Sequence, residues 1–179
     1  YATFLRKRLE KADRPPDELE TINKLLSGLE RAAADTTMLV RYGRPLELRR
    51  APRTDLSRIL AAAEGDAIET ESGTYEGEFD AAALTEALKN IAAGARPVEA
   101  AAGGAASAPE TSAVRLRRDE SGPAAVIEWP GVRGGQDLFR SFVGGNGLRM
   151  ALAAKVIKAH GGEATHEADT IRVRLPLTS

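Results

Sequence analysis

The sequence predicts an α+β protein in which a helical stem is followed by a globular domain of mixed strands and helices. Apolar residues recur at helical spacing over residues 17–43, which indicates a long amphipathic helix. After residue 46 the pattern changes, and short runs of alternating apolar and polar residues are interspersed with helical segments. This order of elements is typical of an α+β domain.

The composition narrows the classes of function open to the chain. It has 179 residues and a formal charge of −1, with both signs interspersed, unlike the one-sided basic field of a nucleic-acid binder. The absence of cysteine excludes disulfides, thiolate catalysis and zinc–thiolate sites, and two histidines are too few for a persuasive metal site. Apolar residues make up 42% and aromatic residues 4%, so we expect a core of Leu, Val, Ile and Ala.

The sequence also indicates whether the chain contains a membrane-spanning segment or a signal peptide. No apolar run approaches the roughly 20 residues that span a bilayer, and no signal-peptide pattern opens the chain. We therefore expect a cytoplasmic chain, which would reach a membrane only through segments outside it.

The stem is predicted to contain two helical segments. The first, over residues 4–12, is highly charged and ends before Pro15-Pro16, because proline cannot continue a helix. Asp17 then caps a second helix, which Gly43 and Pro45 end.

The second helix carries the clearest periodic pattern in the chain. One apolar column alternates by three and four residues and contains Leu19, Ile22, Leu26, Leu29, Ala33, Thr36 and Val40. A further column repeats every seven residues and contains Leu25, Ala32 and Leu39. A seam flanked by a further column favours a multi-helix bundle over a lone surface helix. The alternative is an amphipathic helix packed on its own domain. We favour self-association, because only one short preceding helix is available to cover this face.

The domain begins with elements that capping residues help to delimit. A short helix is predicted over Asp55–Ala63, and two strands over 67–71 and 73–79 are predicted to form a hairpin. Asp80 then caps a helix that runs to about Ala95. The segment 98–112 is of low complexity and is predicted to be a loop.

The second half of the domain is predicted to contain three strands and a helix. The strands are predicted over residues 114–116, 125–129 and 171–175, and the helix over residues 148–159. Residues 133–147 are glycine-rich, and Gly161-Gly162 closes the helix.

Four segments, in this order along the chain, resemble the motifs of a known family. Leu39–Pro45 resembles the end of the dimerisation helix, and Leu84–Ala95 resembles the asparagine-box helix. Asp137–Phe142 is similar to the phenylalanine box in the ATP lid. Gly145–Leu152 resembles the second glycine box and its helix, and it is followed by the His-Gly-Gly turn at His160–Gly162 and a terminal strand. Each motif is weak singly, and it is their shared order and spacing that carry the resemblance.

The resemblance covers nearly the whole chain and implies the core of a bacterial sensor histidine kinase. It implies a dimerisation and phosphotransfer helical hairpin over 1–45, with its first helix truncated, that forms a dimeric four-helix bundle. Residues 46–179 would form an α/β sandwich of the histidine-kinase (GHKL-type) ATPase domain.

The asparagine box departs from the family pattern. In family kinases an asparagine of this helix binds Mg²⁺, a hard cation that prefers oxygen ligands. The matching position here is Gly94, which has no side chain. Asn90 and Glu86 lie one and two turns earlier on the same face. A compensating role for Asn90 stays open, although one turn displaces its amide by ~5 Å.

The first glycine box, Asp-x-Gly-x-Gly in the family, is replaced by Val126–Val132. The family aspartate binds adenine, and Glu128 could replace it only if its longer side chain folds back. Gly131 is interpreted as a remnant of the motif. Trp129 either fills the adenine space with its indole ring or is a core tryptophan, and we favour the core interpretation.

The second glycine box keeps Gly145 and Gly147 but has Arg149 where the family often has glycine. Its backbone amides could still bind an anion, and Arg149 either binds phosphate or covers the surface. The lid between Gly131 and Gly145 is short. The resemblance thus implies a vestigial ATP site formed by Glu86, Asn90, Gly94, Glu128, Gly131, Gly145 and Gly147.

The phosphoacceptor histidine of the family lies on the first hairpin helix, where its imidazole is exposed. We expect it upstream of Tyr1, so no catalytic residue is assigned within the chain. His160 and His166 are interpreted as turn or surface histidines.

By resemblance, we expect a homodimeric two-component signalling protein with weak or lost ATP binding that takes part in phosphotransfer to a response regulator. The receiver domain would dock at the hinge, Tyr42–Leu48, and on a stem face with Arg31 and Met38. No bound cofactor is expected. The alternatives are an active sensor kinase, which would use ATP and Mg²⁺, and a non-catalytic dimeric scaffold that docks a receiver domain.

Overall fold

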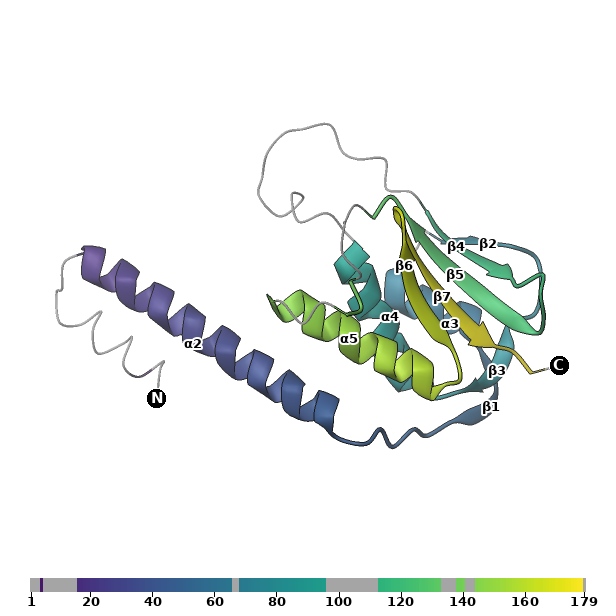
Figure 1. The fold of residues 1–179 in the computed structure, drawn as a ribbon, viewed down its shortest axis with the longest axis horizontal. Helices are drawn as coiled ribbons and strands as arrows, with labels where there is room; N and C mark the ends of the chain where they lie inside the picture. The colour runs from purple at the N-terminus through teal and green to yellow at the C-terminus, as the bar shows by residue number, and fades with distance from the viewer. Residues whose placement is uncertain are drawn as a thin grey trace. The chain divides into compact units, whose positions relative to one another are not determined.

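The computed structural model describes residue 4 and residues 16–65, 68–95, 113–132, 138–140 and 144–178. The chain divides into two compact units, residues 1–43 and residues 44–179. Figure 1 shows one long helix in the first unit and a sheet with three helices in the second. The helix predicted over 4–12, apart from residue 4, and the loop predicted over 98–112 lie outside the described residues.

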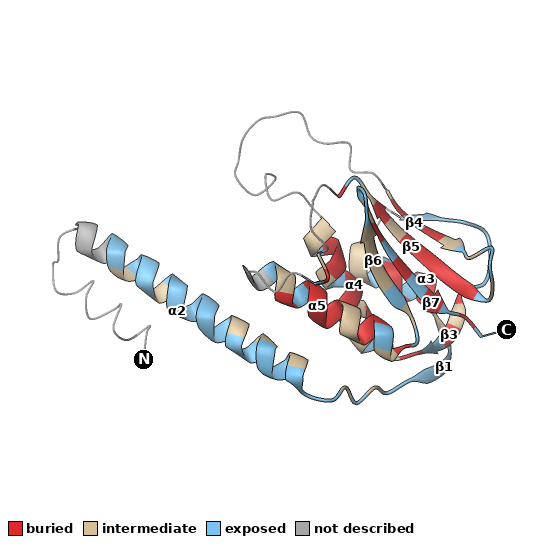
Figure 2. Ribbon diagram, viewed as in Figure 1, coloured by how far each residue is buried: buried red, intermediate tan, exposed pale blue. Residues whose placement is uncertain are grey.

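The helix of the first unit, α2, spans Pro16–Gly43 and ends where the sequence predicts. Several of its apolar side chains face solvent, as the pale blue ribbon in Figure 2 shows. At least half of the residue surface is exposed at four apolar positions, Leu25, Leu29, Leu39 and Val40. Burying such side chains stabilises a protein by roughly 1.5 to 3 kcal/mol each, so this helix presents a large uncovered apolar surface within its own unit.

The second unit is built on a sheet whose strand order, among the described residues, is β2-β4-β5-β7-β6. The strands are β2 (Ile68–Thr70), β4 (Val114–Arg118), β5 (Ala124–Pro130), β6 (Glu163–Glu167) and β7 (Thr170–Pro176). Only the β2–β4 pair is parallel, and the three other pairs are antiparallel. The strands predicted at 114–116, 125–129 and 171–175 are confirmed, whereas β6 was not predicted.

Helices α3 (Leu56–Glu64), α4 (Ala81–Ala95) and α5 (Gly144–Ala159) cover one face of this sheet (Figure 1). The inward side chains of the central strands and the apolar faces of the helices form one core. In β7, for example, Ile171, Val173 and Leu175 are fully buried while Arg172 and Arg174 face outward. The fold class is therefore α+β, with a stem helix and an α/β sandwich, as predicted.

Capping side chains fix the starts of α3 and α4. The Asp55 carboxylate accepts hydrogen bonds from the backbone N–H and the hydroxyl of Ser57. Asp80 Oδ1 accepts a hydrogen bond from the backbone N–H of Ala83 at 3.0 Å. These bonds satisfy backbone donors that a helix start leaves unpaired, and both helices lie where the sequence predicts.

The hairpin predicted over 67–71 and 73–79 is wrong. Strand β2 pairs with β4, while β3 (Glu76–Phe79) pairs antiparallel with β1 (Ala51–Asp55), a strand that was not predicted. The connection turns away at Tyr75, which is buried and donates a hydrogen bond from its hydroxyl to the carbonyl of Glu71 at 3.0 Å. Tertiary contacts thus override the local preference for a hairpin.

Helix α5 begins at Gly144, earlier than the predicted start at residue 148. The second glycine box therefore lies in the first turns of the helix. Glycine is disfavoured in helix interiors by about 1 kcal/mol, which is why the sequence predicted a loop. The buried side chains of Leu148 and Met150, on the turns that follow, hold the helix on the core.

Candidate functional site

The candidate residues of α4 lie on one face of the helix at a spacing of four. Glu86 is exposed, and Asn90 and Gly94 are half-buried. The face thus passes from solvent towards the interior along the helix. Gly94, at the inner end of this face, has no side chain to offer a cation.

The space in front of Gly94 is filled by Met150 of α5. A Cβ atom at Gly94 would lie 2.5 Å from Sδ and 3.2 Å from Cγ of Met150. Met150 is itself 1% exposed and belongs to the core. Any side chain at residue 94 would therefore have to displace a buried thioether. Sequence reasoning missed Met150, because nothing in the local pattern reveals which residue of α4 it contacts.

Trp129 lies in the core near the end of β5. It is 4% exposed, and its indole N–H donates a hydrogen bond to Oε1 of Glu64 at 2.5 Å. A buried tryptophan needs such a partner for its N–H. The favoured interpretation as a core tryptophan fits this position. Glu64, at the C-terminal end of α3, was not predicted to take part.

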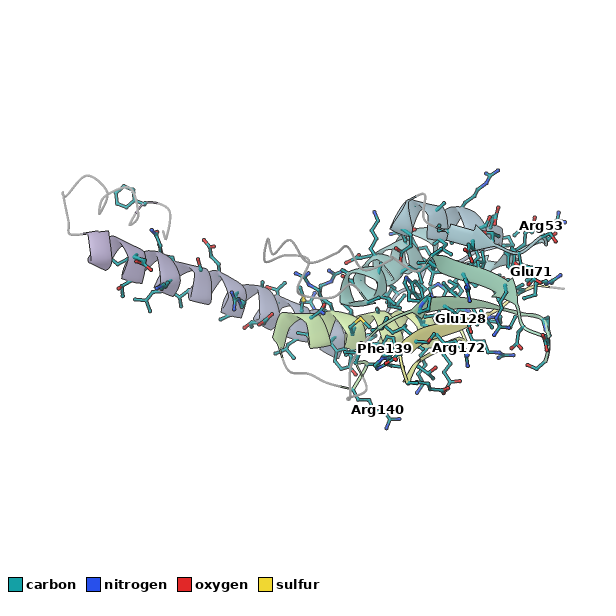
Figure 3. All side chains as sticks on the ribbon, turned by 90° about the horizontal axis from the view of Figure 1, so that it is seen from above. Arg53, Glu71, Glu128, Phe139, Arg140 and Arg172 are labelled. Carbon is teal, nitrogen blue, oxygen red and sulfur yellow. The ribbon has the colours of Figure 1, made fainter. Side chains whose placement is uncertain are left out.

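Glu128 points to the opposite face of the sheet from Trp129, because successive residues of a strand alternate. Its carboxylate lies 3.1 Å from a guanidinium nitrogen of Arg117 and 3.0 Å from one of Arg172. These partners, the hydrogen bond from Arg117 first, lower the pKa of Glu128. Figure 3 shows Glu128 beside Arg172. The structure therefore separates Glu128 from the candidates on α4.

The chain that leaves β5 is held against the β6–β7 turn. Gly131 has φ +80, a conformation that favours glycine. The next residue, Val132, is buried and donates its N–H to the carbonyl of Asp169 at 2.9 Å. A ring nitrogen of His166 lies 3.3 Å from the Val132 carbonyl oxygen. Gly131 therefore serves a tight turn in this structure.

The described part of the phenylalanine box is folded into the domain. Phe139 is 7% exposed and belongs to the core, and Leu138 packs against it. Arg140 is exposed, and Figure 3 shows its side chain pointing away from the body of the domain. Asp137 and Ser141–Phe142 lie outside the described residues.

At the start of α5, Gly145 and Gly147 lie in the first turns of the helix and Arg149 is exposed. The first backbone N–H groups of a helix have no intrahelical partner. These residues could therefore offer backbone donors.

His160 is a buried turn histidine at the other end of α5. It is 2% exposed, its Nε2 accepts a hydrogen bond from the backbone N–H of Asp80 at 3.0 Å, and its Nδ1 lies 2.9 Å from the Val156 carbonyl oxygen. Since Nε2 accepts, the proton is on Nδ1. Burial, above all, lowers the pKa of His160, so the neutral ring ties α5 to the start of α4.

Among the described residues no three His, Cys, Asp or Glu side chains are grouped so that they could hold a metal ion. In the same part of the chain no helix is both long and apolar enough to cross a membrane. The predicted site residues therefore lie in two places. Those on α4 and α5 lie in the helix layer, whereas Glu128 of β5 lies on the outer face of the sheet.

The sequence matches no protein-family model and no curated protein. Solved structures do match its fold. ThkA in complex with the response regulator protein TrrA gives a TM-score of 0.60 at 15% identity, over 99% of this chain and 57% of the ThkA chain. Full-length ShkA in complex with AMPPNP gives 0.56 at 20% identity, over 91% of this chain and 39% of ShkA.

A third structure matches the globular unit by itself. The ATP binding domain of PrrB from Mycobacterium tuberculosis gives a TM-score of 0.50 at 26% identity, over 73% of this chain and 98% of that domain. The chain spans less than two thirds of the ThkA and ShkA chains. It nevertheless has the fold of the sensor histidine-kinase core, a stem helix followed by an ATPase-type α/β domain.

Proposed function

We propose that this chain is the signalling core of a two-component protein that takes part in phosphotransfer to a response regulator, and that its ATPase-type domain binds Mg²⁺-ATP weakly or not at all. The contact between Gly94 and Met150 is the main support for weak binding of Mg²⁺-ATP. At the position where family kinases place a magnesium ligand, this domain has no side chain, and a buried thioether fills the space.

Three further features support weak nucleotide binding. Trp129 lies buried at the end of β5, near where family kinases place the aspartate that binds adenine, and it is bonded to Glu64. The carboxylate of Glu128 faces away and is engaged by two arginines. Phe139, from the predicted lid, is packed in the core. The first two features remove a contact to adenine, and the third holds part of the predicted lid in the core, so their effects on ATP affinity should accumulate.

The uncovered apolar surface of α2 supports the homodimer. Within the first unit Leu25 and Leu29 are 63% and 66% exposed, an arrangement that a bundle with a second copy would bury. The hydroxyl of Thr36, a seam residue, donates to the carbonyl of Ala32 at 2.8 Å. Its hydrogen-bonding need is therefore met inside the helix, and it can enter an apolar interface.

A response regulator is the proposed partner, because the ThkA structure of the same fold contains one. By the family resemblance, the receiver domain would dock on the stem around Met38 and at the hinge. The second candidate function is a scaffold that docks a receiver without transferring phosphate, and the same exposed stem supports it.

One phosphorylation experiment separates the candidates. A chain extended upstream through the expected acceptor histidine is incubated with γ-labelled Mg²⁺-ATP and, separately, with a panel of phosphorylated receiver domains. We expect label to appear on histidine from a receiver but not from ATP. Label from ATP would establish an active kinase, and label from neither source would leave the scaffold.

A further inference from the structure

The outer face of the sheet, on the side away from helices α3, α4 and α5, carries four arginines on its central strands (Figure 1). Their apolar neighbours along each strand belong to the core, so the alternation of side chains turns the arginines outward. We call them the arginine strip, which consists of Arg115 and Arg117 of β4 and Arg172 and Arg174 of β7.

Strand β5 runs between the two pairs of arginines. Val126 of β5 lies opposite both Arg117 and Arg174, and only 3% of its surface is exposed although it points outward. The apolar stem of an arginine can cover such a side chain while its charged head stays in water. The burial of Val126 therefore indicates that the stems of its two neighbours lie over it and leave their guanidiniums at the surface.

The carboxylates that bind the central arginines are less exposed than the arginines themselves. Glu128 lies 3.1 Å from Arg117 and 3.0 Å from Arg172 (Figure 3), and Asp119 of the β4–β5 turn pairs with Arg174. The exposed fraction of the side chain is 16% at both carboxylates and 37% to 61% across the arginine strip. A partner would therefore meet mainly guanidinium groups at the centre of this face.

The guanidiniums keep donors for such a partner. In Arg115, Arg172 and Arg174 it is Nε that donates to a carboxylate of the same face. A guanidinium has four further N–H donors on its two terminal nitrogens, and bidentate binding of a carboxylate uses two of them. Each of these three arginines can thus bind a carboxylate of the domain and one of a partner at the same time.

The edge strands carry the opposite charge. Glu69 of β2 and Glu163 and Glu167 of β6 are exposed and lie on the same face of the sheet as the arginine strip. A wide anionic partner, such as a membrane or a nucleic-acid duplex, would meet these carboxylates as well as the arginines. The arrangement therefore favours a narrow acidic partner.

We propose that the arginine strip binds an acidic α-helix of a partner protein, with the helix lying along the strands. Strands β4 and β7 are two strand spacings apart, about 10 Å, which matches the diameter of about 10 to 12 Å of a helix with its side chains. Two residues along a strand span about 7 Å, close to the rise of about 6 Å between residues i and i+4 of a helix. Carboxylates at this spacing on the two flanks of the helix would each reach one arginine. The strip would bind such a helix whether or not the domain binds nucleotide.

Fluorescence anisotropy with the full chain tests this surface. The probe is a labelled alanine-rich helical peptide with glutamates at i and i+4 on one flank and at i+3 and i+7 on the other. A matched peptide has glutamine in place of every glutamate. Duplex DNA and phosphatidylserine vesicles are tested in parallel as wide anionic partners.

Three variants of the chain accompany the probe. Arg172→Gln with Arg174→Gln removes one side of the strip. The control, Arg53→Gln with Arg58→Gln, removes the same charge at arginines of β1 and α3 whose side chains are 85% and 89% exposed. Arg115→Gln breaks an ion pair with Glu69, which is itself 64% exposed, so this variant should fold as the parent does.

We expect the glutamate peptide to bind saturably and more weakly as salt rises, and the glutamine peptide not to bind. The double variant at residues 172 and 174 should bind the glutamate peptide about tenfold more weakly, and Arg115→Gln about threefold more weakly, because one exposed ion pair contributes up to about fivefold in affinity. The control should bind as the parent. The proposal is overturned if the glutamate peptide does not bind the parent, if the strip variants bind like the control, or if the duplex or the vesicles bind more tightly than the peptide.

Discussion

Gly94 of α4 and Met150 of α5 approach so closely that a Cβ atom on the glycine would lie 2.5 Å from the methionine sulfur. Real Cβ atoms essentially never show such a separation. The contact is therefore a constraint on residue 94, the position that, by the family resemblance, would carry the side chain that binds magnesium.

Restoring asparagine at this position should destabilise the domain. Gly94→Asn would overpack the α4–α5 contact, at a cost of about 1 to 3 kcal/mol in the free energy of unfolding. Ala93→Asn, at an exposed position of the same helix, is the control and should cost only about 0.7 kcal/mol. Denaturant unfolding measures both.

The same pair of variants in a Met150→Ala background isolates the contact. Met150→Ala alone removes buried volume and should cost about 2 to 5 kcal/mol. The added cost of Gly94→Asn should then be smaller than in the parent, because the thioether is gone. Equal costs of Gly94→Asn in the two backgrounds would show that the two residues do not interact.

The stem should dissociate when charge is placed on its seam. Ile22→Asp together with Leu29→Asp removes two apolar side chains that each contribute roughly 1.5 to 3 kcal/mol when buried. We expect a monomer in sedimentation. The control, Asn23→Asp with Ser27→Asp, adds the same charge at exposed polar positions and should remain dimeric. A seam variant that sediments like the parent would refute the bundle.

Acid should weaken the globular domain through His160. Its pKa in the folded domain lies below the ordinary value of 6.5 because the ring is buried, so the unfolded chain binds the proton more readily. The stabilisation is complete above pH 6.5 and is lost as the pH falls towards the lower, folded-state pKa. The proton would enter at Nε2 and break the hydrogen bond from Asp80.

Urea unfolding at pH 7 and at about pH 5 measures this effect. His160→Gln should be less stable at neutral pH and should show a smaller loss of stability between the two pH values. His166→Gln should keep the pH dependence of the parent. The role of His160 is refuted if the free energy of unfolding falls by the same amount between the two pH values in His160→Gln and in the parent.

Receiver docking should depend on Met38 and Tyr42, which are half-buried on α2. Neither residue belongs to the predicted seam, so Met38→Ala with Tyr42→Ala should weaken receiver binding without altering dimerisation. The alternative is that Tyr42 only packs the helix end. Unchanged receiver affinity with a lowered melting temperature would favour that alternative.

Much of the fold could be predicted because its signals are local. Asp55 and Asp80 mark helix starts by residue type, and the alternation of Ile171, Val173 and Leu175 marks a buried strand. Strand pairing is not local. β2 and β3 are adjacent in sequence but join different sheets. β1 was missed because Arg53, with φ +53, interrupts its register.

The candidate site was predictable in part. The alternation of side chains along a strand could have shown that Glu128 faces away from Trp129, which shares its face of β5 with Ile127. The partner of Gly94 could not be read from the sequence, since α4 and α5 are distant along the chain and their packing depends on the whole core. The same holds for the bond between Trp129 and Glu64.

Calorimetric titration of the parent chain with a non-hydrolysable ATP analogue in excess Mg²⁺ tests the central claim most directly. With Met150 filling the space in front of Gly94, we expect no saturable heat at micromolar nucleotide, and a dissociation constant on the order of millimolar or higher. Micromolar affinity would contradict the account and restore an active ATP-binding kinase.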